Sequence, residues 1–490
     1  MNGKDTPTAL VTTIGIECHV QLKTKSKLFA GVGNDARGAE PNTLVSHICF
    51  GLPGALPVLN KDVLHLACRA AYALNAKPEL FSKFDRKHYF YPDLPKGYQI
   101  TQYDQPIIKA GKVIIDVDGQ TKEIRITRAH LEEDAGKNIH PADKDYSLVD
   151  LNRAGTPLLE IVSEPDMHSA AEAKAYAHEL YLLMRYADVS DADLFYGNMR
   201  FDVNVSLAAP GSELGTRTET KNLNSFRSVE KAVEFEVKRQ TGLLNRGEKI
   251  TQETRGWDDL KQKTFSQRSK EEANDYRYFP DPDLPPVVFN EEDVKKIENE
   301  MPILPARWRE VLTELGLNRS QIEILLEANI DLFGEKYLEL VQRNLSNKDF
   351  AKQMVNWIVN VDIPHTREHP SVAAPSHRDK IYQTVAGLTK DNKLSSTKAK
   401  ELIIVLLGAD QLPEDIEQYA QENGYIQVSD QATVNTLVAD VIKQNPQVVN
   451  DIKNGQTKAI GFLVGQIMKA SSGKVNPRLA EQLIKEQIDA

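Results

Sequence analysis

Apolar and polar residues alternate at every second position over residues 11–22. Glu17 and His19 lie on the polar side of this pattern, and the apolar positions are Ile14, Ile16, Cys18 and Val20. A period of two predicts a β-strand with one apolar and one polar face. Residues 199–207 and 216–221 alternate in the same way, so we expect them to form two further strands of this kind.

A helical period marks other segments of the same region. Residues 61–74 and residues 228–244 carry apolar side chains at the spacing of an amphipathic helix. Ser169 and Glu172 have the spacing of a capping box and predict a helix that runs to about residue 186.

A hairpin is expected over residues 112–128. Asp118 and Gly119 supply its turn, because this pair accepts positive φ at little cost. Strands with only scattered helices between them indicate an α+β domain built on an antiparallel sheet.

A proline-dense segment at residues 278–286 ends this region. Prolines remove backbone donors and fix φ, so the segment predicts a domain boundary. Beyond it the pattern is helical, with a softer boundary near residues 408–414. We therefore expect an α+β domain at residues 1–290, an all-α domain at 291–410 and a small helical tail at 411–490.

Composition places the chain among ordinary globular proteins. Of its 490 residues, 41% are hydrophobic and 27% are charged, so extended disorder is not expected. A net charge of −10 argues against a protein that coats nucleic acid, although it is compatible with a local basic patch. The three cysteines lack C-x-x-C spacing, and no apolar run predicts a membrane span or a signal segment. A soluble cytoplasmic protein is expected.

The polar strand faces carry candidate chemistry. Glu17, His19, Asp202 and Glu219 lie on such faces, and three acids follow in residues 132–134. If the strands share one sheet, these carboxylates converge, and a divalent cation such as Mg²⁺ would relieve their repulsion. The interleaved bases suit phosphate, so the set is typical of phosphoryl transfer; they are Arg86, Lys87, Arg200, Arg217 and Lys221. A solvated sheet face explains the pattern equally well.

Two further segments have two interpretations each. Residues 83–98 are rich in bases and aromatic residues, which could stack on nucleotides or pack on one another. The loop at residues 471–477, with Lys469 and Lys474, is either a contact to nucleic-acid phosphates or a surface turn. Phosphate-binding loops of the G-x-x-x-x-G-K-[ST] type are absent from the sequence.

Seven blocks of sequence resemble one family in order along the whole chain. They are IGIECHV at 14–20, YFYPDLP at 89–95, HLEEDAGK at 130–137, DLNRAGTP at 150–157, KNLNSF at 221–226, DYRYFP at 275–280 and GFLVGQIMK at 461–469. The chain thus resembles the B-type subunit of the bacterial tRNA-dependent amidotransferases, which act on Glu-tRNA(Gln) and Asp-tRNA(Asn).

The resemblance implies an architecture and an activity. The first domain would be a cradle-like catalytic domain that uses ATP and Mg²⁺ to phosphorylate the side-chain carboxylate of the mischarged amino acid. Ammonia from an amidase (glutaminase) subunit would then displace phosphate, and a small third subunit would complete a heterotrimer. A divergent scaffold that binds tRNA without catalysis is the alternative.

The resemblance also implies roles for individual residues. The kinase pocket would contain Glu17, His19, Lys87, Glu133, Asp202 and Glu219. Of these, Glu17, His19, Glu133 and Glu219 would bind Mg²⁺, and Lys87 would neutralise the transferring phosphate. Lys469 and Lys474 would contact tRNA. The nucleotide phosphates are expected at four of the interleaved bases named above, Arg86, Lys87, Arg200 and Lys221.

The chain departs from the family pattern at three places. Many relatives have four cysteines where this chain has Ala30, Val32, Ser46 and Cys49, so no structural zinc is expected. An acidic pair is usual where this chain has Phe195-Tyr196, and this change is the main support for the scaffold alternative. A small, glycine-containing stretch is usual within residues 355–362, where this chain has VNWIVNVD.

Overall fold

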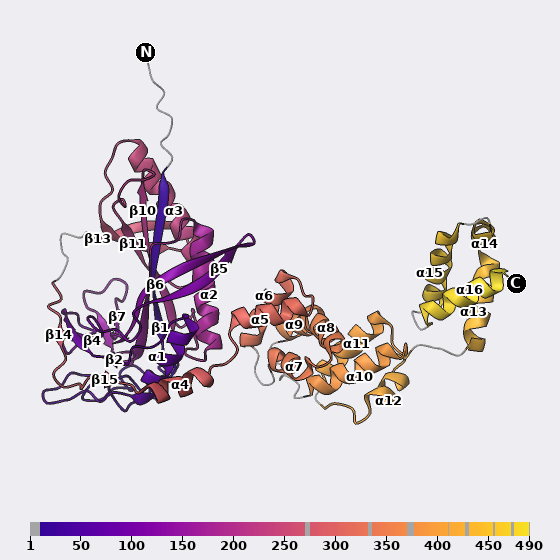
Figure 1. Cartoon of the computed structure of the whole chain (residues 1–490), viewed down its shortest axis with the longest axis horizontal. Coiled ribbons are helices and arrows are strands. Elements are labelled where there is room, and N and C mark those ends of the chain that lie inside the picture. The colour runs from indigo at the N-terminus through magenta and orange to yellow at the C-terminus, as the bar shows by residue number, and fades with distance from the viewer. Residues whose placement is uncertain are drawn as a thin grey trace, which may run out of the picture. The chain divides into compact units, whose positions relative to one another are not determined.

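A computed structural model describes residues 10–269, 275–331, 336–369, 377–409, 411–426, 431–453, 456–471 and 475–489. The chain divides into two compact units, Met1–Pro305 and Ala306–Ala490 (Figure 1). The first unit combines a large sheet with helices and the second is helical, which confirms the α+β fold class. The finer division of the second unit near residue 410 stays a prediction.

An 11-stranded sheet organises the first unit. Its neighbours are antiparallel except for the pair β11 and β12. In spatial order the strands are β13 (Lys263–Ser269), β12 (Glu253–Asp258), β11 (Thr218–Leu223), β10 (Met199–Ala208), β1 (Val11–Gln21), β9 (Pro157–Ser163), β6 (Gln120–Glu133), β4 (Tyr98–Thr101), β3 (Asp85–His88) and β14 (Phe279–Pro280), with β5 (Gly111–Val117) paired to β6.

Strand β1 lies in the middle of this sheet. Its apolar side chains point to one face of the sheet and its polar side chains to the other. It pairs with β10 on one side and β9 on the other. Ile14, Ile16 and Cys18 are at most 1% exposed and belong to the hydrophobic core, whereas Glu17 and His19 point to the opposite face. The predicted strand with one apolar and one polar face is confirmed.

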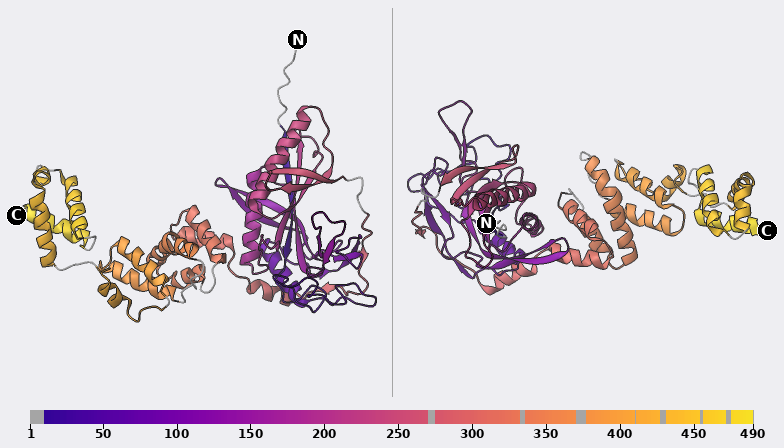
Figure 2. Two further views of the ribbon diagram at one scale, coloured as in Figure 1. Left: turned by 180° about the vertical axis from the view of Figure 1, so that it is seen from behind. Right: turned by 90° about the horizontal axis from the view of Figure 1, so that it is seen from above.

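Three helices pack against the apolar face: α1 (Lys61–Ala73), α2 (Ala170–Tyr186) and α3 (Phe226–Asn245). Figure 2 shows α2 and α3 beside the sheet. Each helix begins after a polar residue whose side chain accepts a backbone N–H, namely Asn60, Ser169 and Ser225. These caps explain why the helices start where they do.

The hairpin at Asp118 and Gly119 is confirmed as the β5–β6 turn, and both residues have positive φ. The proline-dense segment behaves differently from a simple linker, since its residues Phe279 and Pro280 form β14 against β3. Proline is tolerated there because β14 is an edge strand. Helix α4 (Glu291–Asn299) also belongs to the first unit, which therefore extends to Pro305.

Short strand pairs complete the first unit. They are β2 (Phe81–Ser82) with β15 (Val287–Val288), and β7 (Lys137–Ile139) with β8 (Leu148–Asp150).

The second unit consists of helices. They are α5 (Pro305–Glu314), α6 (Arg319–Asp331), α7 (Tyr337–Asn344), α8 (Lys348–Trp357), a π-helix (Ile358–Asp362), α9 (Ile363–Glu368), α10 (Arg378–Lys390), α11 (Ser396–Leu407), α12 (Ile416–Glu422), α13 (Gln431–Gln444), α14 (Pro446–Lys453), a 3₁₀-helix (Thr457–Ala459), α15 (Ile460–Ala470) and α16 (Pro477–Asp489). Buried apolar side chains between Val434 and Ile488 form one hydrophobic cluster. Among the described helices, none has the length and apolarity needed to cross a membrane.

A buried charge network occupies the divergent stretch at residues 355–362. Asp362 is the last residue of the π-helix, and it is fully buried. It accepts hydrogen bonds from the Arg378 guanidinium at 2.7 Å, from Tyr337 Oη at 3.0 Å and from Tyr382 Oη. The departure from the family pattern therefore coincides with a buried hydrogen-bonded network around Asp362.

Candidate functional site

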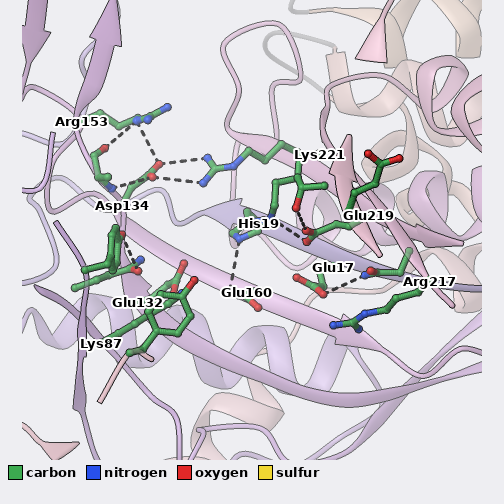
Figure 3. A pocket seen from close by; sticks show the side chains of 18 of the residues that line it. Glu17, His19, Lys87, Glu132, Asp134, Arg153, Glu160, Arg217, Glu219 and Lys221 are labelled. Carbon is green, nitrogen blue, oxygen red and sulfur yellow. Dashed lines mark hydrogen bonds and ion pairs between the residues drawn. The ribbon is translucent and has the colours of Figure 1, made fainter. Parts of the chain in front are cut away.

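The polar face of the sheet lines a cavity of about 610 Å³, called the charged cavity below. Its lining side chains come from strands β1, β3, β4, β6, β9, β10, β11 and β12 and from the loops beside them, so segments far apart in sequence meet there (Figure 3). The reason is the strand register. Arg200, His19, Glu160 and His130 lie opposite one another across four adjacent strands, which puts their side chains on one face.

The first carboxylate cluster consists of Glu17, Asp202 and Glu219, whose ligand oxygens lie within 4.8 Å of one another. Lys221 Nζ lies 2.9 Å from both Asp202 and Glu219, and the Asn222 N–H donates to Asp202 at 2.8 Å. Burial raises the pKa of Glu17, and the nearby carboxylates of Glu160 and Glu219 raise it further. The cluster therefore holds more negative charge than its own lysine neutralises.

The second cluster consists of His19, Glu132 and Glu160, again with ligand atoms within 4.8 Å. His19 Nε2 lies 3.5 Å from Glu160 Oε2, and His130 Nε2 lies 3.6 Å from the same oxygen. Burial lowers the pKa of His19, but the hydrogen bond to Glu160 and the negative charges of Glu160 and Asp202 together outweigh this, and the net shift is upward. Burial raises the pKa of Glu160, but both histidines and Lys87 reverse this and hold it well below its usual range.

Cationic side chains form the remaining wall. Arg200 Nη1 lies 3.3 Å from Asp134 Oδ2, and Arg153 Nε lies 3.5 Å from the same oxygen. Lys87 Nζ lies 4.9 Å from the centre of the Tyr276 ring. Burial lowers the pKa of Lys87, but Glu132 and Glu160 outweigh this and raise it, so the ammonium stays charged.

The donor set fits a hard divalent cation. Five of the six clustered residues offer carboxylate oxygens, which Mg²⁺ prefers. The buried Nδ1 of His19 has no hydrogen-bond partner among the described residues, so this imidazole is only partly committed to protein contacts. Each cluster could hold one cation, and the bases around them could hold phosphate oxygens.

Most of the residues expected from sequence lie together. Glu17, His19, Lys87, Arg200, Glu219 and Lys221 line the charged cavity. Asp202 is buried next to it in the first cluster.

The other expected residues lie elsewhere. Arg86 is held by Asp281 and Asp283 at 2.8 Å each and does not line the charged cavity. Glu133 is bound by Lys96 and by the Ile100 N–H at 2.9 Å, outside both clusters. Lys469 is exposed at the end of α15, and Lys474 lies outside the described residues. The roles of these residues stay predictions.

Sequence reasoning missed Glu160 in the second cluster and did not single out Glu132. Glu160 is central to it, and its signal is a single acid within the otherwise apolar strand PLLEIVS of β9. Glu132 is one of three adjacent acids, of which the family resemblance selects Glu133 instead. Because β6 continues to residue 133, adjacent acids point to opposite faces, and Glu132 is the one that shares a face with His130.

The segment that carries four cysteines in many relatives is organised here around a buried amine. Lys27 is fully buried, and its Nζ donates to the Leu44 carbonyl at 2.7 Å and lies 3.6 Å from Cys49 Sγ. Phe195 and Tyr196 are exposed and do not line the charged cavity.

A mostly antiparallel sheet thus gathers two acidic clusters and a cationic wall, a set of side chains that suits phosphoryl transfer. Residues 12–295 match the family described as GatB/GatE catalytic domain, and residues 336–488 match the GatB domain. The chain belongs to the family of B-type subunits of the aspartyl/glutamyl-tRNA(Asn/Gln) amidotransferases.

Curated relatives extend over nearly the whole chain. The B-type subunit of the aspartyl/glutamyl-tRNA(Asn/Gln) amidotransferase of Persephonella marina is 44% identical over 481 residues, covering 96% of this chain and 98% of the relative. The protein of the same name from Moorella thermoacetica is 42% identical, with 97% and 99% coverage. That from Carboxydothermus hydrogenoformans is 43% identical, with 97% and 98% coverage.

Proposed function

We propose that this chain is the ATP-dependent subunit of a tRNA-dependent amidotransferase. It would transfer the γ-phosphoryl group of ATP to the side-chain carboxylate of Glu-tRNA(Gln) or Asp-tRNA(Asn), giving ADP and an acyl phosphate. Ammonia would then attack the acyl carbon and expel phosphate, leaving Gln-tRNA(Gln) or Asn-tRNA(Asn). The family membership and the two carboxylate clusters support this proposal.

The two steps explain why phosphate is needed. A carboxylate resists attack by ammonia because an oxide ion is a poor leaving group. Phosphorylation replaces it with phosphate, a good leaving group, at the cost of one ATP. The ammonia would come from an amidase (glutaminase) subunit, with a small third subunit completing the heterotrimer in the cytoplasm, where charged tRNA is used.

The carboxylates would hold Mg²⁺. Glu17, Asp202 and Glu219 are proposed for one ion, and His19, Glu132 and Glu160 for another. When bound, Mg²⁺ would supply positive charge that offsets the phosphate charge repelling an incoming carboxylate.

The bases have a separate role in the proposal. Lys87 and Arg200 stay charged within the charged cavity, so they would bind the oxygens of the transferring phosphoryl group. Lys221 is fixed between Asp202 and Glu219 and would hold the first cluster in place. Lys469 and Lys474 are proposed contacts to tRNA phosphates.

The single observation that carries the proposal is the convergence of two three-residue ligand clusters on one sheet face with cationic side chains beside them. A solvated face would not bury Glu132 and Asp202 to 4% and 3% exposure. Burial of several carboxylates at one place is expensive unless a cation or positive substrate group offsets it.

The test is ADP release by the chain co-expressed with its amidase and small partners. We expect ADP with Mg²⁺, ATP and Glu-tRNA(Gln) or Asp-tRNA(Asn), and none when charged tRNA is omitted. Glu219→Gln should lower the rate at least about 100-fold, because it removes a proposed Mg²⁺ ligand from the first cluster.

A matched control is Glu123→Gln, which changes an exposed acid of β6 that pairs with Lys112 outside the charged cavity. It should leave the rate unchanged. If tRNA binding persists but neither charged tRNA yields ADP, the chain is a scaffold and not a kinase. An unchanged rate for Glu219→Gln would refute its assignment to the metal.

A further inference from the structure

A second cavity, of about 560 Å³, adjoins the charged cavity. Arg153 lines both. The partition between them is a chain of hydrogen bonds in which Asn198 Nδ2 donates to Gln21 Oε1 at 2.8 Å and Gln21 Nε2 donates to Asp134 Oδ2 at 3.3 Å. A ligand in the second cavity would therefore be separated from the proposed reaction by one layer of side chains.

The lining of the second cavity differs from that of the charged cavity. It contains four bases and three acids, which nearly balance: Lys23, Arg37, Lys137 and Arg153 against Asp35, Asp150 and Asp191. The rest is mainly amide and hydroxyl side chains, namely Gln21, Thr24, Asn34, Asn152, Thr156 and Asn198. Such a lining suits a neutral ligand with many donors and acceptors better than a run of phosphates.

Two aromatic residues stand at this cavity. Tyr196 lines it and is 57% exposed, and Phe195 is 88% exposed with its ring centre 5.2 Å from that of Tyr196. Asp193 Oδ1 accepts the N–H groups of both residues, at 2.8 and 3.1 Å, which fixes the turn that presents them.

Arg37 adds a planar cation, 5.9 Å from the centre of the Tyr196 ring. It is itself oriented by two hydrogen bonds to Asp35, at 2.7 and 2.9 Å. Exposed aromatic rings beside a guanidinium form a surface on which a nucleic-acid base stacks.

We propose that the second cavity is a nucleoside site in which the Tyr196 ring stacks on the base, the nearly perpendicular Phe195 ring packs against the rim of the base, and the amide side chains bind its polar edge and the ribose. The occupant we assign is the terminal nucleoside of the charged tRNA, so the inference rests on the proposed function. The amino acid is esterified to the ribose of that nucleoside. Binding it beside Arg153, which lines both cavities, would bring the aminoacyl group up to the partition that borders the charged cavity.

The nucleoside of ATP has the same chemistry and is the other source of such a ligand. The tRNA terminus is favoured because the aromatic pair is exposed and can be reached by a single strand from outside. An acidic pair at these positions would repel the neighbouring phosphates, whereas aromatic residues do not.

The experiment uses the full-length chain without catalysis. One probe is uncharged tRNA with 2-aminopurine as its terminal base, and the other is ATP with 2-aminopurine in place of adenine. Stacking quenches this fluorescent base. We expect quenching of the tRNA probe by the wild-type chain and its loss in Phe195→Ala/Tyr196→Ala, with about tenfold weaker tRNA binding. A tRNA trimmed of its terminal nucleotide should bind both chains equally.

The control is Phe81→Ala, which removes an aromatic residue that is 48% exposed and lines neither cavity. It should behave as wild type. If the double variant loses quenching of the ATP probe alone, the nucleoside site stands but its occupant is ATP. If neither probe responds to the double variant, the inference is overturned, whether or not assembly with the amidase partner changes. ADP release is measured separately, so a failed kinase proposal would not be mistaken for a failed nucleoside site.

Discussion

The fold disfavours the ionised form of Glu17. Its carboxylate lies beside those of Asp202 and Glu219, and the residue is directly across the strand pair from Asp202. Burial raises its pKa above the usual value, and the neighbouring carboxylates add to the shift. The folded chain therefore binds a proton at Glu17 more strongly than the unfolded chain does.

This shift predicts that Glu17→Gln stabilises the protein at neutral pH without Mg²⁺. Because the folded pKa exceeds the unfolded value of 4.5, the stability associated with this group is present at low pH and is lost as pH rises through the folded pKa. Gln keeps the neutral form at every pH. Thermal unfolding with chelator should give a higher midpoint for the variant at pH 7 and nearly equal midpoints at pH 4.

Mg²⁺ supplies the contrasting measurement. It should raise the unfolding midpoint of the wild type at pH 7, and raise that of Glu17→Gln much less. If Glu17→Gln is instead less stable than the wild type at pH 7 in chelator, the ionised Glu17 carboxylate does not destabilise the fold. That result would contradict the raised pKa of Glu17.

At the residue scale, sequence reasoning identified most of the charged cavity but not its second cluster. Glu17, His19 and Glu219 could be found because each strand alternates clearly over several residues. The choice between Glu132 and Glu133 could not be made, because it depends on where β6 ends and which strand it pairs with. Glu160 could not be assigned to the site from sequence, because only the strand register places it opposite His19 and His130.

At the scale of elements, local signals predicted strands and helices closely. Residues 61–74 form α1 (Lys61–Ala73), and residues 228–244 lie within α3 (Phe226–Asn245). The strand expected at residues 216–221 is displaced to Thr218–Leu223. What could not be predicted is the order of strands, because pairs such as β1 with β9 join residues more than 130 positions apart.

The carboxylate of Glu236 on helix α3 contacts three strands of the sheet. This fully buried group accepts a hydrogen bond from Thr218 of β11 at 2.9 Å, pairs with Arg255 of β12 at 3.0 Å and contacts Thr264 of β13. Arg239 of the same helix adds a bond at 2.7 Å. The parallel pairing of β11 and β12 covers only two residue pairs, so this carboxylate supports the strand that carries Glu219.

We expect Glu236→Gln to destabilise the first unit by about 3 kcal/mol, because it leaves two arginines without their buried anion. It should also weaken Mg²⁺ binding, since Glu219 follows Thr218 on β11. Glu234→Gln, on the same helix but exposed and paired with Lys231, is the control and should change stability by less than about 0.5 kcal/mol. Urea unfolding measures both variants. Equal stability of the two would contradict the role given to Glu236.

At the scale of the whole molecule, the first compact unit extends past the proline-dense segment to Pro305. The hydrophobic core of this unit also receives Met301 and Leu304, and the Tyr72 hydroxyl donates to the Val294 carbonyl at 3.1 Å. These contacts come from α4 and the residues after it. The residues that make these contacts lie between residue 290, where the sequence predicts the boundary, and Pro305, where the first unit ends.

Two truncated chains test this boundary. Residues 1–305 should fold alone, with the unfolding midpoint of the first transition in the full chain. Residues 1–290 should be less stable by about 2–4 kcal/mol, because burial of apolar side chains on α4 and after it is lost. Circular dichroism and urea unfolding compare them. Two fragments of equal stability would place the end of the unit at residue 290.

The central position of β1 restricts how the length of this protein can change in evolution. Side chains on a strand alternate, so adding or deleting one residue near Gly15 would exchange the two faces from that point onward. Glu17 and His19 would then point into the hydrophobic core, and Ile16 and Cys18 would face the charged cavity. Point substitutions there can be tolerated singly, but insertions and deletions cannot. Length variation among relatives should therefore gather in connections such as the Asp118–Gly119 turn.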